Sequence, residues 1–303
     1  MTLREILVER IAPSRQYCDR TVELYESSLD RFRDFLGHDP TLDDLSDATV
    51  GKWLKWRAVT PHGKRRPVRP ASVAKDSTQV KSIWTYCAKK RLKRSDGNDI
   101  EFPDYRNPVV PMPVPKAFTA DELAQILAAA RHRRGRISGK PAAWYWMTKV
   151  RALYQTGERI GAVLELRWRE VDLARHTLTF LAHTRKGRRE TLTQPITPRL
   201  CELLAPQQEA PGERVWPWLD ARAKLSLYGS WRLLLQSAKV PYKPFHSIRK
   251  STASYLKLGG VSAKKQLGHA TDGIAEMHYY DEEIVGRANN LSVLPDIEPG
   301  VAN

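Results

Sequence analysis

The stretch TGERIGAVLELRW, from Thr156 to Trp168, decides the fold, because it joins a long apolar helix to a charged turn and a second apolar segment. The apolar spacing before it predicts a helix over about residues 142–155. Gly157 should end that helix, since glycine adopts the conformations of helix ends without steric cost. Arg159 then begins the next turn, where a rigid support would hold its side chain.

The segment that follows has the pattern of a small β-hairpin. Two short β-like stretches, His176–Ala182 and Glu190–Ile196, flank a basic turn. Alternating apolar and polar residues around a glycine-containing turn favour two paired strands. The turn would present Lys186 at its tip.

Further along, Phe245-His-Ser-Ile-Arg249 places a histidine and an arginine three residues apart. In the first turn of a helix, His246 and Arg249 would share one face, and a helix N-terminus favours a bound phosphate. Gly259 should end this helix. By itself such a pair is more often a solvated helix start than a site.

Two more elements complete the series. Gln266-Leu-Gly-His269 reads as a short helix ended by glycine, with the histidine on the turn. The pair Tyr279–Tyr280 follows ten residues later. A single histidine after a turn is usually structural, and a tyrosine pair usually packs, so only the whole series is informative.

Taken in order over about residues 117–284, these segments resemble the catalytic domain of the tyrosine recombinases, also called phage-type integrases. TGERIGAVLELRW resembles their first arginine box and RKGRRETLTQPI their hairpin lysine segment. HSIRKSTASYL resembles their His-x-x-Arg box, and LGH with the later tyrosine resembles their last box. The catalytic residues that the resemblance implies are Arg159, Lys186, His246, Arg249, His269 and Tyr279, with Tyr280 as the second choice for the nucleophile.

These residue types suit attack on a phosphodiester. Two arginines, Arg159 and Arg249, can clamp the non-bridging oxygens bidentately, where negative charge grows in the transition state. A tyrosine hydroxyl has a pKa near 10 and needs nearby cations or a base, for which His246 is the better candidate. Lys186 would be the general acid that protonates the leaving 5′-oxygen. The resemblance implies a 3′-phosphotyrosine intermediate with no cofactor, ATP or metal.

Three positions depart from the family pattern. Ala162 stands where an acidic residue often follows the first arginine, and Glu158 stands where an apolar or small residue is common. A carboxylate beside Arg159 would weaken its hold on phosphate or point to solvent. The usual spacing for the nucleophile falls on His278, one residue before Tyr279.

The chain is expected to be mainly α, with a small β-sheet in its second domain, in a two-domain clamp. A helical core-binding domain over residues 1–101 would contain helices at about 22–36, 47–57 and 72–91. The stretch FPDYRNPVVPMPVP, with four prolines between Phe102 and Pro115, marks a linker over 102–116. The mixed α/β catalytic domain would then cover residues 117–303.

Charge and composition point to DNA as the partner. The 303 residues carry a net charge of +16, with an excess of basic residues on both sides of the linker. The three cysteines are far apart, which argues against a disulfide framework or zinc site and suits a reducing cytoplasm. The basic residues expected to contact DNA are Lys64, Arg65, Arg66, Arg69, Lys89, Lys90, Arg185 and Arg188.

The leading hypothesis is a site-specific recombinase or integrase acting on double-stranded DNA as a homotetramer. The apolar tail after Tyr280 would pack on a neighbouring subunit, and accessory DNA-bending proteins would be possible. Two alternatives stay open: a type IB topoisomerase with the same catalytic set, and a DNA-binding protein of this fold that no longer cuts. No segment resembles a signal peptide or a membrane span, so the protein is expected in the cytoplasm, without membrane partners.

Overall fold

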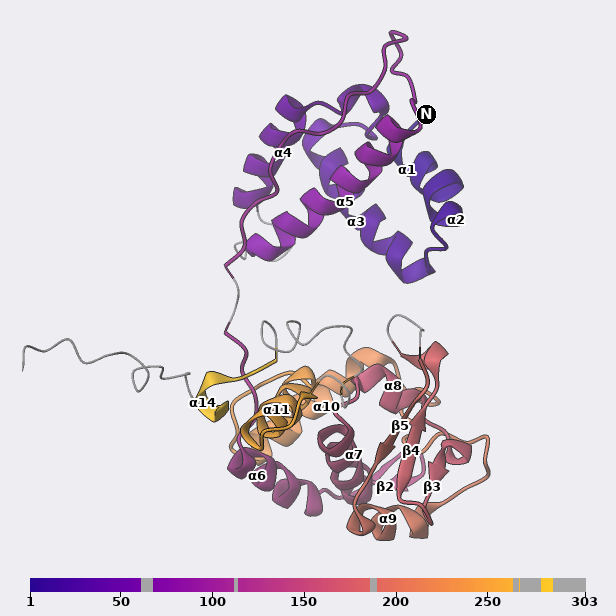
Figure 1. The fold of residues 1–303 in the computed structure, drawn as a ribbon, viewed down its shortest axis with the longest axis vertical. Helices are drawn as coiled ribbons and strands as arrows, with labels where there is room; N and C mark the ends of the chain where they lie inside the picture. The colour runs from indigo at the N-terminus through magenta and orange to yellow at the C-terminus, as the bar shows by residue number, and fades with distance from the viewer. Residues whose placement is uncertain (61–67, 112–113, 186–189, 264–266, 268–278, 286–303) are drawn as a thin grey trace, which may run out of the picture. The chain divides into compact units, whose positions relative to one another are not determined.

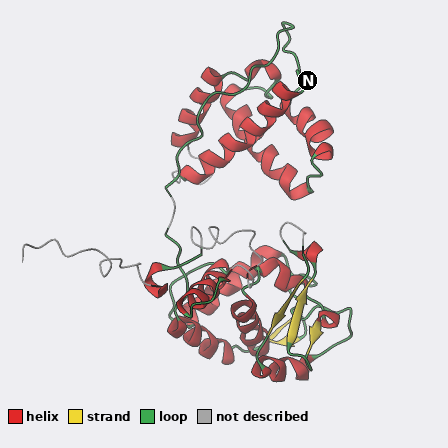
Figure 2. Cartoon of the chain, viewed as in Figure 1, coloured by secondary structure: helices red, strands yellow, loops and turns green. Residues whose placement is uncertain are grey.

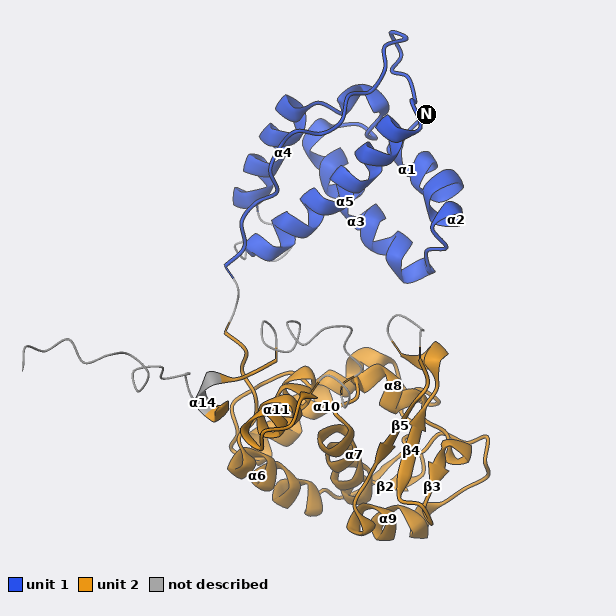
Figure 3. Ribbon diagram, in the orientation of Figure 1, with its two compact units in different colours: residues 1–112 blue, residues 113–303 orange. Residues whose placement is uncertain are grey.

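The computed structural model describes residues 1–60, 68–111, 114–185, 190–263, 267 and 279–285. The chain divides into two compact units, Met1–Met112 and Pro113–Asn303 (Figure 3). The division falls inside the linker that the prolines predict. Helices dominate both units, and strands occur only in the second of them among the described residues (Figure 2). The predicted fold class, mainly α with a small sheet in the second domain, is therefore confirmed.

The first unit is a small helical domain. Its elements are α1 (Leu3–Ile6), a π-helical turn (Leu7–Ile11), α2 (Ala12–Ser14), α3 (Asp19–Leu36), a 3-10 turn (Leu42–Asp44), α4 (Asp47–Val59) and α5 (Pro70–Lys89). The three longest correspond to the three helices that the sequence predicts. Gly37 ends α3 in the left-handed conformation, with φ of +82°, as expected for a glycine after the last helical turn.

The core of this unit combines aromatic packing with one buried ion pair. Phe32 of α3 packs against Trp53 of α4, with ring centroids 4.8 Å apart. Nearby, Arg57 Nε lies 2.9 Å from Asp76 Oδ2, and the Ser28 hydroxyl donates to Asp76 Oδ1 at 2.6 Å. Because a buried charge is tolerated only when it is paired, this network fixes how α3, α4 and α5 meet.

The second unit places helices around a small sheet. Its elements are α6 (Ala120–Arg131), β1 (Arg136–Ile137), β2 (Lys140–Pro141), α7 (Ala142–Thr156), α8 (Ile160–Glu165), β3 (Val171–Asp172), β4 (Thr177–Phe180), β5 (Leu192–Pro195), α9 (Pro198–Leu204), α10 (Lys224–Ser237), α11 (His246–Leu258) and α14 (Glu282–Val285), with 3-10 turns at Trp168–Glu170, Ala182–Thr184 and Ala205–Gln207. Figure 1 shows α7 in the middle of this unit, where it packs against α6, α9, α11 and β5.

The larger sheet has the order β3-β4-β5 and is antiparallel throughout. Leu178 pairs with Gln194 and Phe180 with Leu192. Leu178 and Phe180 are buried in the core, whereas the alternate residues Thr177 and Thr179 are more exposed. This alternation is the reason the sequence predicts strands here.

Aromatic side chains fill the core of the second unit. Trp146 of α7 stacks with Trp231 of α10 and with Phe245, at centroid distances of 6.0 and 6.4 Å. Trp231 and Phe245 stack on each other at 4.6 Å. Because Phe245 directly precedes α11, this packing sets where that helix begins. Within the described ranges, no helix has the length and apolar character needed to cross a membrane.

Candidate active site

The turn after α7 places the start of the first arginine box against α11 and Leu267. Gly157 ends α7 with φ of +64°. A Cβ added at this glycine would lie 2.4 Å from Leu267 Cδ2 and 3.2 Å from Thr252 Cγ2. Glycine is therefore required both by its backbone conformation and by the close approach of two other segments. Arg159 follows as the residue that precedes α8, with its side chain partly exposed.

Arg249 joins three separate segments of the chain. It lies in the first turn of α11 and is 1% exposed. Its Nη1 donates to the carbonyl of Gly157 at 2.7 Å and its Nη2 to the carbonyl of Leu267 at 2.8 Å. Burial lowers the pKa of Arg249, whereas the neighbouring Tyr279 raises it and Arg159 lowers it further. The two arginines are therefore close enough to repel each other, as a shared anion site requires.

Tyr279 lies beside this arginine. Its side chain is 6% exposed, and its ring centroid lies 5.3 Å from Arg249 Cζ and 5.2 Å from the His246 ring centroid. Tyr280 is partly buried, and its ring faces Lys257 Nζ at 5.6 Å. Of the two adjacent tyrosines, Tyr279 is the one placed against the histidine and arginine of α11.

The backbone around Tyr279 is held by residues that the sequence analysis did not identify. The Ser254 hydroxyl on α11 donates to the carbonyl of Tyr279 at 3.4 Å and accepts from the backbone N–H of Asp281 at 2.9 Å. The Asp281 carboxylate in turn accepts from the backbone N–H of Ala117 at 2.5 Å. The backbone at and just after the tyrosine is thus hydrogen-bonded to α11, and the Asp281 side chain to the segment that precedes α6.

Glu158 is buried, at 2% exposure, and its carboxylate is fully engaged. Its Oε1 accepts from Arg185 Nε at 2.7 Å and its Oε2 from the backbone N–H of Arg159 at 3.0 Å. The expectation that Glu158 points to solvent is therefore wrong, because its carboxylate is buried and paired with Arg185. Whether it weakens the hold of Arg159 on phosphate stays a prediction. Arg185, expected on DNA, is only 8% exposed and has its Nε and Nη1 engaged within the protein.

The geometry therefore assembles the arginine box, the His-x-x-Arg box and the tyrosine in one place. A match to a family model shows to which protein family the chain belongs. The phage integrase family model matches residues 116–284, which is more than half of the chain. This chain belongs to the phage integrase family.

Individual relatives of this chain agree with that assignment. The chain is 25% identical over 198 residues to a XerC tyrosine recombinase from Pseudomonas syringae. The match covers 63% of this chain but only 39% of that protein. Two solved structures share the fold of this chain. A lambda integrase dimer bound to a COC′ core site has a TM-score of 0.68 at 19% identity, covering 98% of this chain and 99% of that one. The XerH recombinase in a post-cleavage complex with difH has a TM-score of 0.67 at 12% identity, covering 96% and 84%.

Six of the predicted site residues lie outside the described residues, namely Lys64, Arg65, Arg66, Lys186, Arg188 and His269, and so does His278. Three others are exposed and lie at the ends of α5. Arg69 directly precedes the helix, and Lys89 and Lys90 lie at its C-terminal end. Exposed cations at helix ends suit contacts with backbone phosphates. Their role on DNA stays a prediction.

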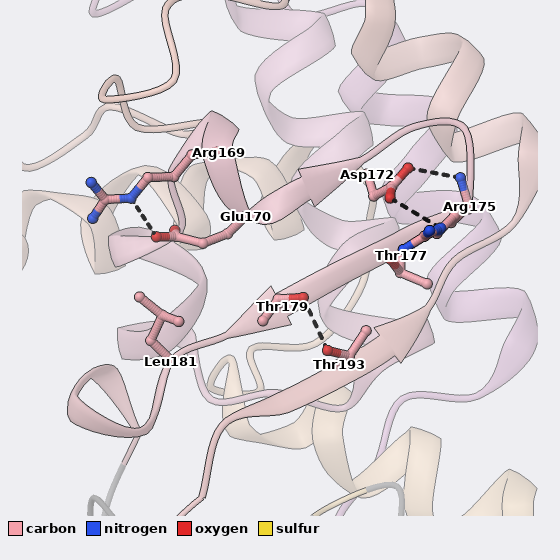
Figure 4. Close-up of a pocket in the computed structure, with 8 residues that line it drawn as sticks. All are labelled: Arg169, Glu170, Asp172, Arg175, Thr177, Thr179, Leu181 and Thr193. Atoms are coloured by element: carbon pink, nitrogen blue, oxygen red, sulfur yellow. Dashed lines mark hydrogen bonds and ion pairs between the residues drawn. The ribbon is translucent and has the colours of Figure 1, made fainter.

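A separate hollow of about 580 Å³ lies over the outer face of the sheet (Figure 4). Its arginines are paired with adjacent acids: Arg169 Nε lies 3.0 Å from Glu170 Oε1, and Arg175 Nε lies 3.8 Å from Asp172 Oδ2. Because these charges are balanced locally and the hollow contains none of the residues around Tyr279, we assign it no part in the site. Across the described part of the chain, no group of three histidine, cysteine or acidic side chains could hold a metal.

Proposed function

We propose that this integrase is a site-specific recombinase that cuts and rejoins DNA through Tyr279. The observation that carries the proposal is the placement of the Tyr279 ring against His246 and Arg249, at 5.2 and 5.3 Å. A nucleophilic hydroxyl, a possible base and a phosphate-binding cation are thereby within reach of one phosphodiester. The fold and the family support the same activity.

The reaction follows from these groups. Arg159 and Arg249 hold the non-bridging oxygens of the phosphate. The Tyr279 oxygen attacks phosphorus while His246 takes its proton, so a bond forms between the tyrosine oxygen and phosphorus. The bond from phosphorus to the 5′-oxygen breaks, and Lys186 gives that oxygen a proton. A free 5′-hydroxyl of the partner strand then reverses the same steps, so no energy source is needed; His269 would assist by a hydrogen bond to the phosphate.

The buried position of Arg249 has a consequence for DNA binding. The guanidinium is 1% exposed, and Tyr279 lies over it. A phosphate reaches this arginine only after groups that cover it, the tyrosine ring among them, have moved. Binding of the target DNA and positioning of the nucleophile are therefore coupled in this proposal.

The partners that we propose are two DNA duplexes and further copies of this chain. Lambda integrase has been solved as a tetramer bound to a Holliday junction, which is the assembly that strand exchange between two duplexes requires. The first unit, with exposed cations at both ends of α5, would be the core-binding domain and would contact backbone phosphates. The protein would act in the cytoplasm, where the DNA lies, with accessory DNA-bending proteins as possible helpers.

The test is capture of covalently bound DNA. Purified protein is incubated with nicked duplexes whose central sequence is randomised, and DNA that stays attached under denaturing conditions is sequenced. Wild type and Tyr280→Phe should both retain a defined sequence, and Tyr279→Phe should retain none. If wild type binds duplexes but retains no DNA after denaturation, the cutting activity is refuted and a non-cutting DNA-binding protein is favoured.

A second readout separates recombination from topoisomerase activity. Two duplexes carrying the captured sequence should yield joined recombinant products. Relaxation of a supercoiled plasmid without any recombinant product would instead support the type IB topoisomerase and would contradict the recombinase.

A further inference from the structure

The ion pair between Glu158 and Arg185 connects two segments that carry residues of the proposed site. Its partners are 27 residues apart in the chain, and their side chains are 1% and 7% exposed. Burying a carboxylate and a guanidinium carries a desolvation cost that even a good pairing geometry only roughly offsets. The pair is therefore poor evidence for added stability, and its value lies in holding its neighbours in one arrangement.

Each oxygen of Glu158 has a different partner. One accepts from the Arg185 side chain and the other from the backbone N–H of Arg159, the residue that would clamp the phosphate. Gly157 directly precedes Glu158 in the chain, and its carbonyl accepts from Arg249 Nη1. The carboxylate also raises the pKa of Arg249, so its charge favours the charged form of that arginine. Glu158 thus lies between both phosphate-binding arginines.

Arg185 holds the two ends of a short segment together. Besides pairing with Glu158, its Nη1 donates to the carbonyl of Glu190 at 3.0 Å. Residues 186–189 run between these two ends, and Lys186 is the first of them in the sequence. The flat, forked guanidinium is suited to this double role, because it can donate in two directions at fixed geometry.

We infer that Glu158 and Arg185 are positioning residues that hold the ends of the Lys186 segment against the backbone of Arg159. The inference rests on the proposed function, since it concerns delivery of the proton to the leaving oxygen. Neither residue touches DNA in this account; both act through the residues next to them. A purely structural role would change stability and would not discriminate between leaving groups.

The test compares two leaving groups. The duplex recovered by covalent capture is nicked beside the cut and made with either the ordinary 5′-oxygen or a bridging 5′-sulfur at the scissile phosphate. A sulfur leaving group needs no proton, so its departure does not depend on the general acid. Single-turnover cleavage and DNA affinity are measured for wild type, Glu158→Gln and Arg185→Lys. The control is Glu122→Gln, which breaks another ion pair of this unit, with Lys243 Nζ at 2.6 Å from Glu122 Oε2.

Both variants should cleave the oxygen substrate at least about tenfold more slowly, since general acid catalysis contributes about 10²- to 10⁴-fold. Each should cleave the sulfur substrate at nearly the wild-type rate, with DNA affinity unchanged. On the oxygen substrate, Lys186→Ala should slow cleavage by a smaller factor in Glu158→Gln than in wild type. The control should match wild type on both substrates.

Two results would overturn the inference. Equal slowing on both substrates would mean that the pair acts through phosphate binding or stability, and rates equal to wild type on both would mean that it positions nothing. In either case wild-type cleavage leaves the proposed function standing. If wild type cleaves neither substrate, the proposed function itself fails and the inference fails with it.

Discussion

Replacing Lys149 by methionine should stabilise the protein. Lys149 lies in α7, is 0% exposed and has no hydrogen-bond partner for its Nζ among the described residues. Its Nζ lies 3.8 Å from the ring centroid of Trp146 and 4.3 Å from that of Tyr145. Burial holds the pKa of this amine well below its ordinary value. Burying this amine therefore lowers the free energy of unfolding, because the amine is solvated and charged in the unfolded chain.

The size of the stability change follows from the interactions that methionine removes and those that it retains. An unsatisfied buried polar group costs about 1–3 kcal/mol. Amine–ring contacts return about 0.5–2 kcal/mol when the amine is charged, and a methionine sulfur keeps about 0.3–1.5 kcal/mol of ring contact. The two side chains have similar volume, so little strain is added. We expect Lys149→Met to add about 1–2 kcal/mol, which for a unit of this size raises Tm by about 2–8 °C.

The pH dependence gives an independent check. Because the folded-state pKa of Lys149 is lowered, the unfolded chain binds the extra proton, and wild-type stability rises with pH up to the ordinary lysine pKa of about 10.4. The advantage of Lys149→Met should therefore shrink between pH 7 and pH 10. Urea unfolding followed by circular dichroism measures both quantities, with the exposed Lys116→Met as control. A loss of more than about 1 kcal/mol at pH 7 would refute the reasoning, because it would mean that ring contacts outweigh desolvation.

Two further substitutions test the cores of the two units. Gly157→Ala should cost more than about 2 kcal/mol and lower cleavage activity, because the new Cβ would lie 2.4 Å from Leu267 Cδ2 at a positive φ; an alanine variant with wild-type stability in urea would contradict this. Asp76→Ala should cost about 3 kcal/mol or more, because Arg57 would be left buried without its partner. Burial raises the pKa of Asp76, but the hydrogen bond from Ser28 and adjacent cations outweigh it and the net pKa is lowered. Its contribution is then present above about pH 4 and lost below, so acid titration should destabilise wild type more than the variant.

Most helices could be predicted from the sequence because local signals mark them. Apolar periodicity and the terminal glycines predict α3, α7 and α11 close to their observed bounds. The β1–β2 hairpin could not be predicted from apolar periodicity, since each of its strands has only two residues. The dipeptide Ser138-Gly139, with φ of +47° and +82°, is the turn signal that would have indicated it.

The candidate site could be predicted only in part. Motif order indicates which residue types take part, because the chemistry of phosphate demands arginines, a base and a nucleophile. It does not show which side chains support them. Asp281 and Ala117 are 164 residues apart, and the pairing of Glu158 with Arg185 depends on how the hairpin meets the turn after α7. Such contacts are products of tertiary packing and leave no local pattern in the sequence.

The most direct test of the central claim is to identify the residue that becomes attached to DNA. Wild-type protein is trapped on the captured nicked duplex, digested with nuclease and protease, and its peptides are analysed by mass spectrometry. The account predicts a nucleotide phosphate on Tyr279, the tyrosine beside His246 and Arg249. A phosphate on Tyr280, or on any other side chain, would contradict it.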